Sequence, residues 1–271
     1  MKLKPEVTRY LLCGKRGLPM MEEAMAFAES ILQTKNLAKH PDFLLVELGD
    51  KKELTVEDTE AVISKTSLAP AVAESTVVII DSFESMNTTA QNKLLKTLED
   101  AKRVYLILIA YGIKGVLPTV ESRCTRVRYA PMSLAEWKPL QPDDDFCSYY
   151  AAEGCPGVLE ERENLLSMFH EAWSAFAEEK FENLLPAFHL LTEKDKDSVT
   201  ASPYVPQTLT FLNACAIRKL SETQADPAKR EFYLGIEKLI GEEIEKQGRR
   251  YSKDNFFLLI ARIISLSKGG K

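Results

Sequence analysis

Hydrophobic residues in the first half of the chain form short continuous runs that alternate with segments of helical periodicity. The apolar runs lie at 8–13, 43–48, 75–81 and 103–110. The amphipathic segments between them lie at 20–33, 55–66 and 88–100. Strands that helices cover on both faces read as continuous apolar runs, because neither side of such a sheet meets water. The pattern therefore predicts an α/β domain with a parallel sheet.

The second half of the chain has a different pattern. From about residue 132 the apolar runs stop and helical periodicity continues. Clusters of proline, glycine or short polar residues, which end helices, interrupt it at 141–145, 154–157 and 200–207. We predict α/β followed by all-α, with an α/β domain over 1–131, a small helical domain over 132–180 and a helical domain over 181–271.

Two helical segments carry more specific expectations. Thr88 is followed three residues later by Gln91, which is the spacing of a capping box, and the leucines of the helix then form one apolar stripe. Near the end of the chain, the segment at 255–267 is apolar around much of its circumference. A helix on the surface of a monomer usually turns a polar face to water, and this segment has little polar surface. We therefore expect it to bury part of its apolar surface against other subunits.

The turn after the first apolar run has the order of a P-loop without its chemistry. A phosphate-binding P-loop reads G-x-x-x-x-G-K-[ST], in which amides surround the phosphates, the lysine reaches them and the hydroxyl holds magnesium. With Gly14 as the first glycine, Pro19, Met20 and Met21 stand where glycine, lysine and serine or threonine are required. Proline also lacks an amide hydrogen to offer a phosphate. We therefore expect no productive binding of Mg-ATP.

Two further nucleotide-site elements are degraded in the same way. Asp81 ends the run at 75–81, as a Walker B carboxylate does, but Ser82 follows where hydrolysing relatives of the Asp-Glu type carry a glutamate. The next run ends in Ala110 and Tyr111, with no obvious polar sensor residue. One degraded glycine motif arises easily by chance, whereas three degraded elements in the correct order indicate a nucleotide-binding fold that has lost its activity.

Composition narrows the functional classes. The chain has 271 residues, 45% of them hydrophobic and 28% charged, which is typical of a soluble globular protein. The net charge of -5 argues against a protein that coats nucleic acid unaided. No signal-like or membrane-spanning apolar segment is evident, so we expect a cytoplasmic protein without membrane contact. The five cysteines and three histidines are scattered without metal-ligand spacing, and no metal site is expected.

Four stretches identify a family resemblance. They are HPDFLLVEL (40–48), VVIIDSFESMNTTAQNKLLKTLED (77–100), VLPTVESRC (116–124) and EGCPGVLEE (153–161). In order and spacing they resemble the delta-prime subunits of bacterial DNA polymerase III clamp loaders. The pair NKLLKTLE and LPTVESRC is far more specific than either half alone. The helical remainder is compatible with this family only by its length and position.

The resemblance implies a subunit with an AAA+ domain, a helical lid and a C-terminal collar domain that joins sister subunits in a ring. Such subunits belong to the DNA polymerase III holoenzyme, help to load the sliding clamp onto primed DNA and do not hydrolyse ATP. Ser122, Arg123 and Cys124 match the family's Ser-Arg-Cys motif, in which Arg123 would be an arginine finger for the ATP site of the adjacent subunit. The implied partners are gamma/tau and delta subunits, with the sliding clamp and primer-template DNA reached through the complex. No cofactor is expected on this chain, because neighbouring subunits bind the ATP.

The sequence departs from the family in two places, and two other functions stay open. Many members carry a zinc module before the His-Pro-Asp stretch, but residues 31–42 here contain no cysteine, so no zinc is expected. Residues 100–104 replace the usual proline-containing turn. One alternative is an active gamma/tau-type ATPase, which shares the LLKTLE and SRC stretches. The other is a scaffold or regulatory protein on an inactivated AAA+ fold. For Arg123 itself, the alternative is a solvated surface charge near Arg126 and Arg128.

Overall fold

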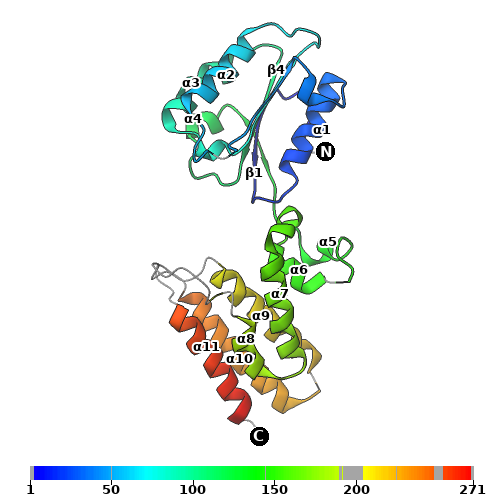
Figure 1. Cartoon of the computed structure of the whole chain (residues 1–271), viewed down its shortest axis with the longest axis vertical. Helices are drawn as coiled ribbons and strands as arrows, with labels where there is room; N and C mark the ends of the chain where they lie inside the picture. Colours follow the sequence, from blue (N-terminus) through cyan, green and yellow to red (C-terminus); the bar gives the residue numbers. More distant parts are fainter. Residues whose placement is uncertain are drawn as a thin grey trace. The chain divides into compact units, whose positions relative to one another are not determined.

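The computed structural model describes residues 3–49, 51–143, 145–188, 191, 204–223, 225–246 and 253–269. The chain divides into two compact units, Met1–Pro131 and Met132–Lys271, whose elements are labelled in Figure 1. The ends of the predicted domains at residues 1 and 271 lie outside the described residues, as do residues 144 and 200–203 of the predicted helix breaks. The predicted fold class is confirmed: an α/β unit with a parallel sheet is followed by helices.

The first unit alternates strands and helices. In chain order its elements are β1 (Arg9–Cys13), α1 (Met20–Leu32), η1 (Leu37–Lys39), β2 (Phe43–Val46), α2 (Val56–Ser67), β3 (Thr76–Ile80), η2 (Phe83–Ser85), α3 (Thr88–Asp100), β4 (Val104–Ala110), α4 (Pro118–Glu121) and β5 (Thr125–Arg128). The strands form one sheet in the order β2-β3-β4-β1-β5, and every neighbouring pair is parallel. Helix α1 covers one face of the sheet, and α2, α3 and α4 lie on the other (Figure 1).

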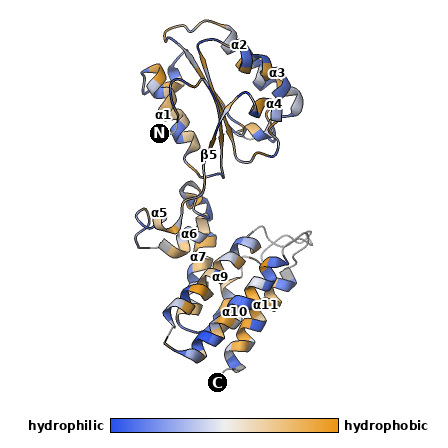
Figure 2. Cartoon of the chain, turned by 180° about the vertical axis from the view of Figure 1, so that it is seen from behind, coloured by the Kyte–Doolittle hydropathy of each residue, from blue (hydrophilic) through white to orange (hydrophobic). Residues whose placement is uncertain are grey.

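Side chains of alternate residues on the central strands enter two separate layers. Leu11 of β1 belongs to the cluster under α2 and α3, together with Leu94 and Leu98 of α3. On the opposite face, the ring of Tyr10 packs edge-on against Phe27 of α1 at 6.0 Å between centroids. Both layers are buried, and Figure 2 accordingly colours the central strands hydrophobic. This double burial is why the strands appear in the sequence as continuous apolar runs.

The capping box predicted at Thr88 is wrong. Thr88 is already the first residue of α3, and the N-cap is Asn87, whose side chain accepts a hydrogen bond from the Ala90 amide at 2.9 Å. Gln91 is buried and has other partners: its amide group donates to the carbonyl oxygens of Met86 and Gly115, at 2.7 and 2.5 Å. Gln91 therefore fixes the loop before α4 to the start of α3.

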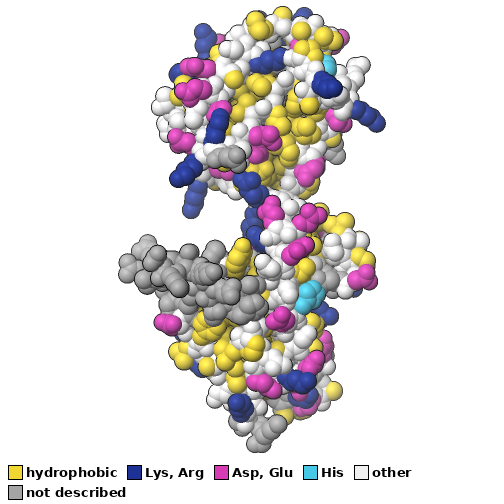
Figure 3. Space-filling view, viewed as in Figure 1, with side chains coloured by type: hydrophobic (Ala, Val, Ile, Leu, Met, Phe, Trp, Pro, Cys, Tyr) yellow, Lys and Arg dark blue, Asp and Glu magenta, His cyan; other side chains and the backbone are white. Residues whose placement is uncertain are grey.

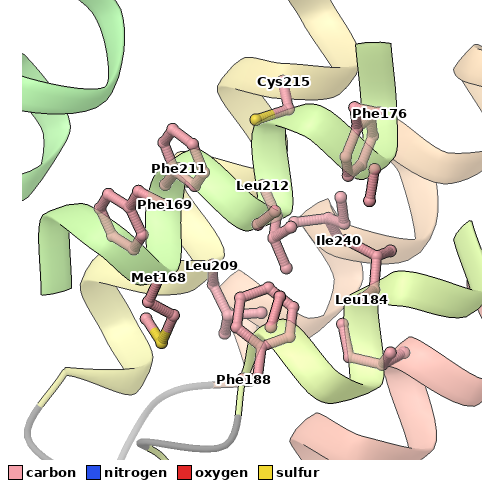
Figure 4. Packing of buried hydrophobic residues seen from close by; sticks show 14 of the residues in the cluster. Met168, Phe169, Phe176, Leu184, Phe188, Leu209, Phe211, Leu212, Cys215 and Ile240 are labelled. Carbon is pink, nitrogen blue, oxygen red and sulfur yellow. The ribbon is translucent and has the colours of Figure 1, made fainter. Parts of the chain in front are cut away.

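The second unit is helical in its described part. Its elements are α5 (Leu134–Trp137), α6 (Asp145–Ala152), η3 (Pro156–Val158), η4 (Glu160–Arg162), α7 (Glu163–Ala177), η5 (Phe181–Asn183), α8 (Leu184–Ala187), α9 (Val205–Glu222), α10 (Pro227–Glu245) and α11 (Lys253–Gly269). One hydrophobic cluster runs from Phe146 to Ile263. Figure 4 shows its centre, where the rings of Phe169 and Phe211 stack at 4.0 Å. Helices on both sides of residue 180 therefore share one core, and the domain division predicted there stays a prediction.

Helix α11 buries one stripe and exposes another. Phe256, Leu259 and Ile263 are fully buried, whereas Leu258 is 62% exposed and Leu266 42% exposed. On the face that carries α11, Figure 3 shows hydrophobic side chains among the charged ones. The helix therefore packs one apolar stripe against its own unit. Two large leucines on its other side remain exposed to water. Among the described residues, none of the helices is both long enough and apolar enough to cross a lipid bilayer.

Candidate functional site

The residues singled out in the sequence lie at two opposite edges of the sheet. All carboxyl ends of parallel strands meet at one edge, so the turn after β1, Asp81 after β3 and Tyr111 after β4 share the carboxyl edge. The Ser-Arg-Cys triplet directly precedes β5, and in the β1–β5 register Tyr10 pairs with Thr125. Arg123 therefore belongs to the amino edge. The structure brings the P-loop-like residues together and keeps the triplet apart from them.

The turn at 14–19 is folded onto itself. The Gly14 amide donates to the Ala110 carbonyl at 3.2 Å, and the Met20 amide donates to the Leu18 carbonyl at 2.7 Å. The side chains of Leu18 and Met20 are buried, and a Cβ on Gly14 would lie only 3.0 Å from Leu18 Cδ1 and 3.1 Å from Met20 Sδ. A side chain at position 14 would therefore require these neighbours to shift by a few tenths of an ångström. The Met20 amide, which stands at the P-loop lysine position, is thus already bonded within the chain.

Asp81 accepts hydrogen bonds from its own chain on both carboxylate oxygens. The Tyr111 hydroxyl donates to Oδ1 at 2.8 Å, and the Ser82 hydroxyl donates to Oδ2 at 3.0 Å. The Tyr111 amide also donates to Glu84 Oε2 at 3.0 Å, while the Arg16 guanidinium lies 4.3 Å from the centre of the tyrosine ring. Burial, and then the hydrogen bond to Asp81, raise the pKa of Tyr111 well above its ordinary value. The sequence placed Tyr111 after β4, and the structure shows that it contacts Asp81.

Arg123 is oriented by α3 and α4. Ser122 ends the short helix α4, and the Arg123 Nη1 donates to the Thr119 carbonyl at 2.8 Å. The Arg123 Nε donates to Glu99 Oε1 at 2.5 Å, and Nη2 contacts the same oxygen. The side chains of Arg123 and Glu99 are 34% and 47% exposed, so the pair lies at the surface. Glu99 was not singled out in the sequence.

Ser122 and Cys124, the two neighbours of Arg123, carry no charge at neutral pH. The Ser122 hydroxyl donates to the Thr119 carbonyl at 3.1 Å, so it closes the end of α4. Cys124 is partly buried and forms no disulfide. Burial raises the pKa of its thiol to about 12, while the nearby Arg9 charge acts in the opposite direction. Cys124 therefore stays protonated at neutral pH, and Arg123 is the member of the triplet that carries charge.

Arg9 holds the turn that follows Glu99. Its guanidinium donates to the carbonyl oxygens of Leu98, Ala101 and Val104, at 3.0, 2.5 and 2.5 Å. The unusual turn at 100–104 is thus fixed by an arginine from β1 in place of a proline. In the part of the chain that the structure describes, no three side chains of the His, Cys, Asp or Glu type are grouped so that they could hold a metal ion.

Comparison with known proteins finds similarity over the first unit of the chain. Residues 6–133 match the protein family described as "DNA polymerase III, delta subunit". Just under half of the chain is therefore similar to that family. A DNA polymerase III delta-prime subunit from Pseudomonas aeruginosa is 30% identical over 89 residues, which cover 32% of this chain and 27% of that protein. The predicted resemblance to delta-prime clamp-loader subunits is therefore confirmed.

Two more distant similarities accompany this family. A tau/gamma subunit of DNA polymerase III from Haemophilus influenzae is 28% identical over 130 residues, which cover 42% of this chain and 19% of that protein. The matched segments thus span about a quarter or less of both curated relatives. The solved structure of a gamma subunit-related protein from Thermotoga maritima aligns with 97% of this chain and 96% of its own, at 16% identity and a TM-score of 0.47.

Proposed function

We propose that this chain is a delta-prime-type subunit of the DNA polymerase III clamp loader, which does not hydrolyse ATP and supplies Arg123 to the ATP site of an adjacent subunit. The observation that carries the proposal is that Arg123 and the turn at 14–19 lie at opposite edges of the sheet. Strand β1 has five residues, and at about 3.3 Å per residue it separates the edges by roughly 15 Å. An arginine in this position is suited to a site on another chain.

The carboxyl edge does not fit Mg-ATP. Met20 and Met21 offer neither a cation nor a hydroxyl at the start of α1, and the amides of Gly14 and Met20 are bonded within the chain. Both oxygens of Asp81 already accept hydrogen bonds from neighbouring hydroxyls. A magnesium shell would have to displace them without the lysine that normally reaches the phosphates. The proposal is therefore that this chain carries no cofactor and that only neighbouring subunits bind ATP.

The proposed partners are gamma/tau and delta subunits in the cytoplasm, with the sliding clamp and primer-template DNA reached through the assembled complex. In this proposal 1–131 is the AAA+ domain, 132–180 the lid and 181–271 the collar. Support for a collar contact comes from the exposed leucines of α11, Leu258 and Leu266. Large apolar side chains in water on one helix are available for burial against a sister subunit.

Phosphoryl transfer explains why an arginine is needed. Negative charge spreads over the equatorial oxygens of the transferred group, and positioned cations stabilise it. The planar guanidinium presents several donors in a fixed fork that matches such oxygens, whereas an ammonium group presents a single point of charge. In GTPases such a finger is worth about 10³ to 10⁵ in rate. Several ATP sites share the ring, so the loss in total turnover is smaller when one finger is removed.

The test is the ATPase rate, stimulated by DNA and the clamp, of reconstituted rings whose composition is verified by mass. Arg123→Ala is expected to leave the ring assembled and to reduce turnover strongly, and Arg123→Lys to restore little of it. Arg126→Ala is the matched control, because Arg126 is similarly exposed (33%) and pairs with Glu121 at 3.4 Å. Unchanged turnover in the Arg123→Ala ring would leave Arg123 as a solvated surface charge and end the proposal.

A further inference from the structure

We infer that Glu99 is a positioning residue for Arg123: it holds the guanidinium in one orientation before a neighbouring subunit presents its ATP. This inference rests on the proposed function of Arg123. A guanidinium has five N–H donors in a plane. Glu99 Oε1 accepts from Nε at 2.5 Å and contacts Nη2, and the Thr119 carbonyl accepts from Nη1 at 2.8 Å. These contacts come from two different elements, so together they fix the plane of the group.

The same contacts leave donors for a phosphate. Three of the five N–H groups face Glu99 and Thr119, and the other two belong to the terminal nitrogens. Among the described residues, Ser122 Oγ approaches one of these nitrogens, at 3.4 Å, which is a long contact. The side chain of Arg123 is 34% exposed. A phosphate oxygen can therefore replace water at the terminal nitrogens without breaking the contact with Glu99.

The location of Glu99 also indicates a role beyond helix stability. Glu99 lies in the last turn of α3, where the partial negative charge of the helix end disfavours a carboxylate. The backbone around it is nevertheless held firmly, because Leu98 is buried and Arg9 donates to the carbonyls of Leu98 and Ala101. The ion pair with Arg123 accounts for the Glu99 carboxylate at this otherwise unfavourable position. Because the backbone on both sides of Glu99 is held by Arg9, the carboxylate is well placed to orient Arg123.

Without Glu99, the long side chain of Arg123 would have to lose its rotamer freedom during phosphoryl transfer. Immobilising such a side chain changes a rate about two- to tenfold. In the reconstituted ring, Glu99→Ala is therefore expected to lower kcat by this factor with KM for ATP unchanged, because the nucleotide itself is bound elsewhere. Glu99→Gln is expected to recover part of the rate, since its amide oxygen still accepts from Nε.

Two further variants isolate the pairing. The double variant Glu99→Ala with Arg123→Ala is expected to be no slower than Arg123→Ala alone, because Glu99 acts only through the arginine. Glu60→Ala is the matched control: it removes another exposed carboxylate, which pairs with Lys93 of α3 at 3.0 Å, and should leave turnover unchanged. Unchanged or faster turnover of the Glu99→Ala ring, beside a slow Arg123→Ala ring, overturns the role of Glu99 and leaves the proposed function intact.

A second readout does not depend on the ring. In the isolated chain, the Nε–H of Arg123 gives an NMR signal whose exchange with water reports the hydrogen bond to Glu99. Exchange is expected to accelerate in Glu99→Ala and to stay unchanged in Glu60→Ala. Equal exchange in the wild type and Glu99→Ala overturns the positioning role. Full turnover of the Arg123→Ala ring, by contrast, overturns the proposed function itself.

Discussion

Replacing Tyr111 by phenylalanine tests whether the chain itself occupies the carboxylate that an active relative would use for magnesium. The change keeps the ring and its contact with the Arg16 guanidinium, and it removes the 2.8 Å hydrogen bond to Asp81 Oδ1. Hydrogen bonds to charged groups contribute about 1.5–3 kcal/mol to stability. Both residues are partly exposed, so water replaces some of this bond. We expect Tyr111→Phe to lower the free energy of unfolding by about 1–2 kcal/mol.

The assay is thermal unfolding of the purified chain, with and without millimolar Mg-ATP. For a unit of this size a loss of about 1–2 kcal/mol lowers Tm by roughly 3–8 °C. Tyr105→Phe is the matched control, because the Tyr105 hydroxyl donates at 2.9 Å to the Pro5 carbonyl at the surface. Mg-ATP is expected to raise the Tm of neither the wild type nor the variant, since a ligand that binds the folded state must stabilise it.

Alkaline pH provides an internal check on the same bond. Because burial and the hydrogen bond to Asp81 raise the pKa of Tyr111 in the folded chain, its stabilisation is complete below the unfolded pKa of about 10. It is lost as the pH rises further, so the difference between wild type and Tyr111→Phe should narrow there. If wild type and Tyr111→Phe had the same Tm at neutral pH, the hydrogen bond from Tyr111 to Asp81 would contribute nothing to stability. A clear rise in Tm with Mg-ATP would instead favour the active gamma/tau-type alternative.

Two further predictions concern the buried Asp42 and helix α11. Burial acts to raise the pKa of Asp42, but the backbone amides at 71–73 donate to its carboxylate at 2.6–2.8 Å and lower the pKa overall. Asp42→Asn should therefore lower the free energy of unfolding by about 1–3 kcal/mol at pH 7. This cost should shrink as the pH falls below about 3.9, and a pH-independent cost in urea unfolding would contradict the mechanism. Leu258→Glu should weaken ring assembly, measured by mass, and leave Tm unchanged. The control Leu140→Glu, at a leucine that is 52% exposed near α5, should leave both assembly and Tm unchanged. Full assembly of the Leu258→Glu ring would exclude α11 from the contact.

The parallel sheet was predictable because its central strands are buried on both faces, and burial on both faces leaves a continuous apolar run in the sequence. Strand β5 left no such signal: three of its four residues are exposed and the sequence reads TRVR. The capping box failed for a local reason. The helix begins one residue earlier than the box requires, and Gln91 finds better partners in the loop before α4.

The candidate site was predictable only where a motif carries it. The Ser-Arg-Cys triplet singled out Arg123, and Met20 stands in the sequence where a P-loop would carry lysine. The functional roles drawn from these two motifs stay predictions. Glu99 and the contact of Tyr111 with Asp81 were missed, because tertiary packing brings these partners together, Glu99 over 24 residues from Arg123 and Tyr111 over 30 residues from Asp81. Periodicity reports which face of an element is buried. It does not report which polar groups from separate elements meet.

The two edges of the sheet lead to opposite expectations for stability and activity. At the carboxyl edge, Tyr111 donates a hydrogen bond to Asp81, so breaking this contact should destabilise the fold and leave the turnover of the ring unchanged. At the amino edge, the Arg123–Glu99 pair is exposed, and exposed ion pairs contribute only about 0.2–1 kcal/mol. Arg123→Ala should therefore change Tm little and turnover greatly. Measuring both quantities for both variants separates a structural edge from a catalytic one. If Arg123→Ala mainly lowers Tm, the arginine serves to hold α3 and α4 together at the surface, and any loss of turnover follows from the lower stability of the fold.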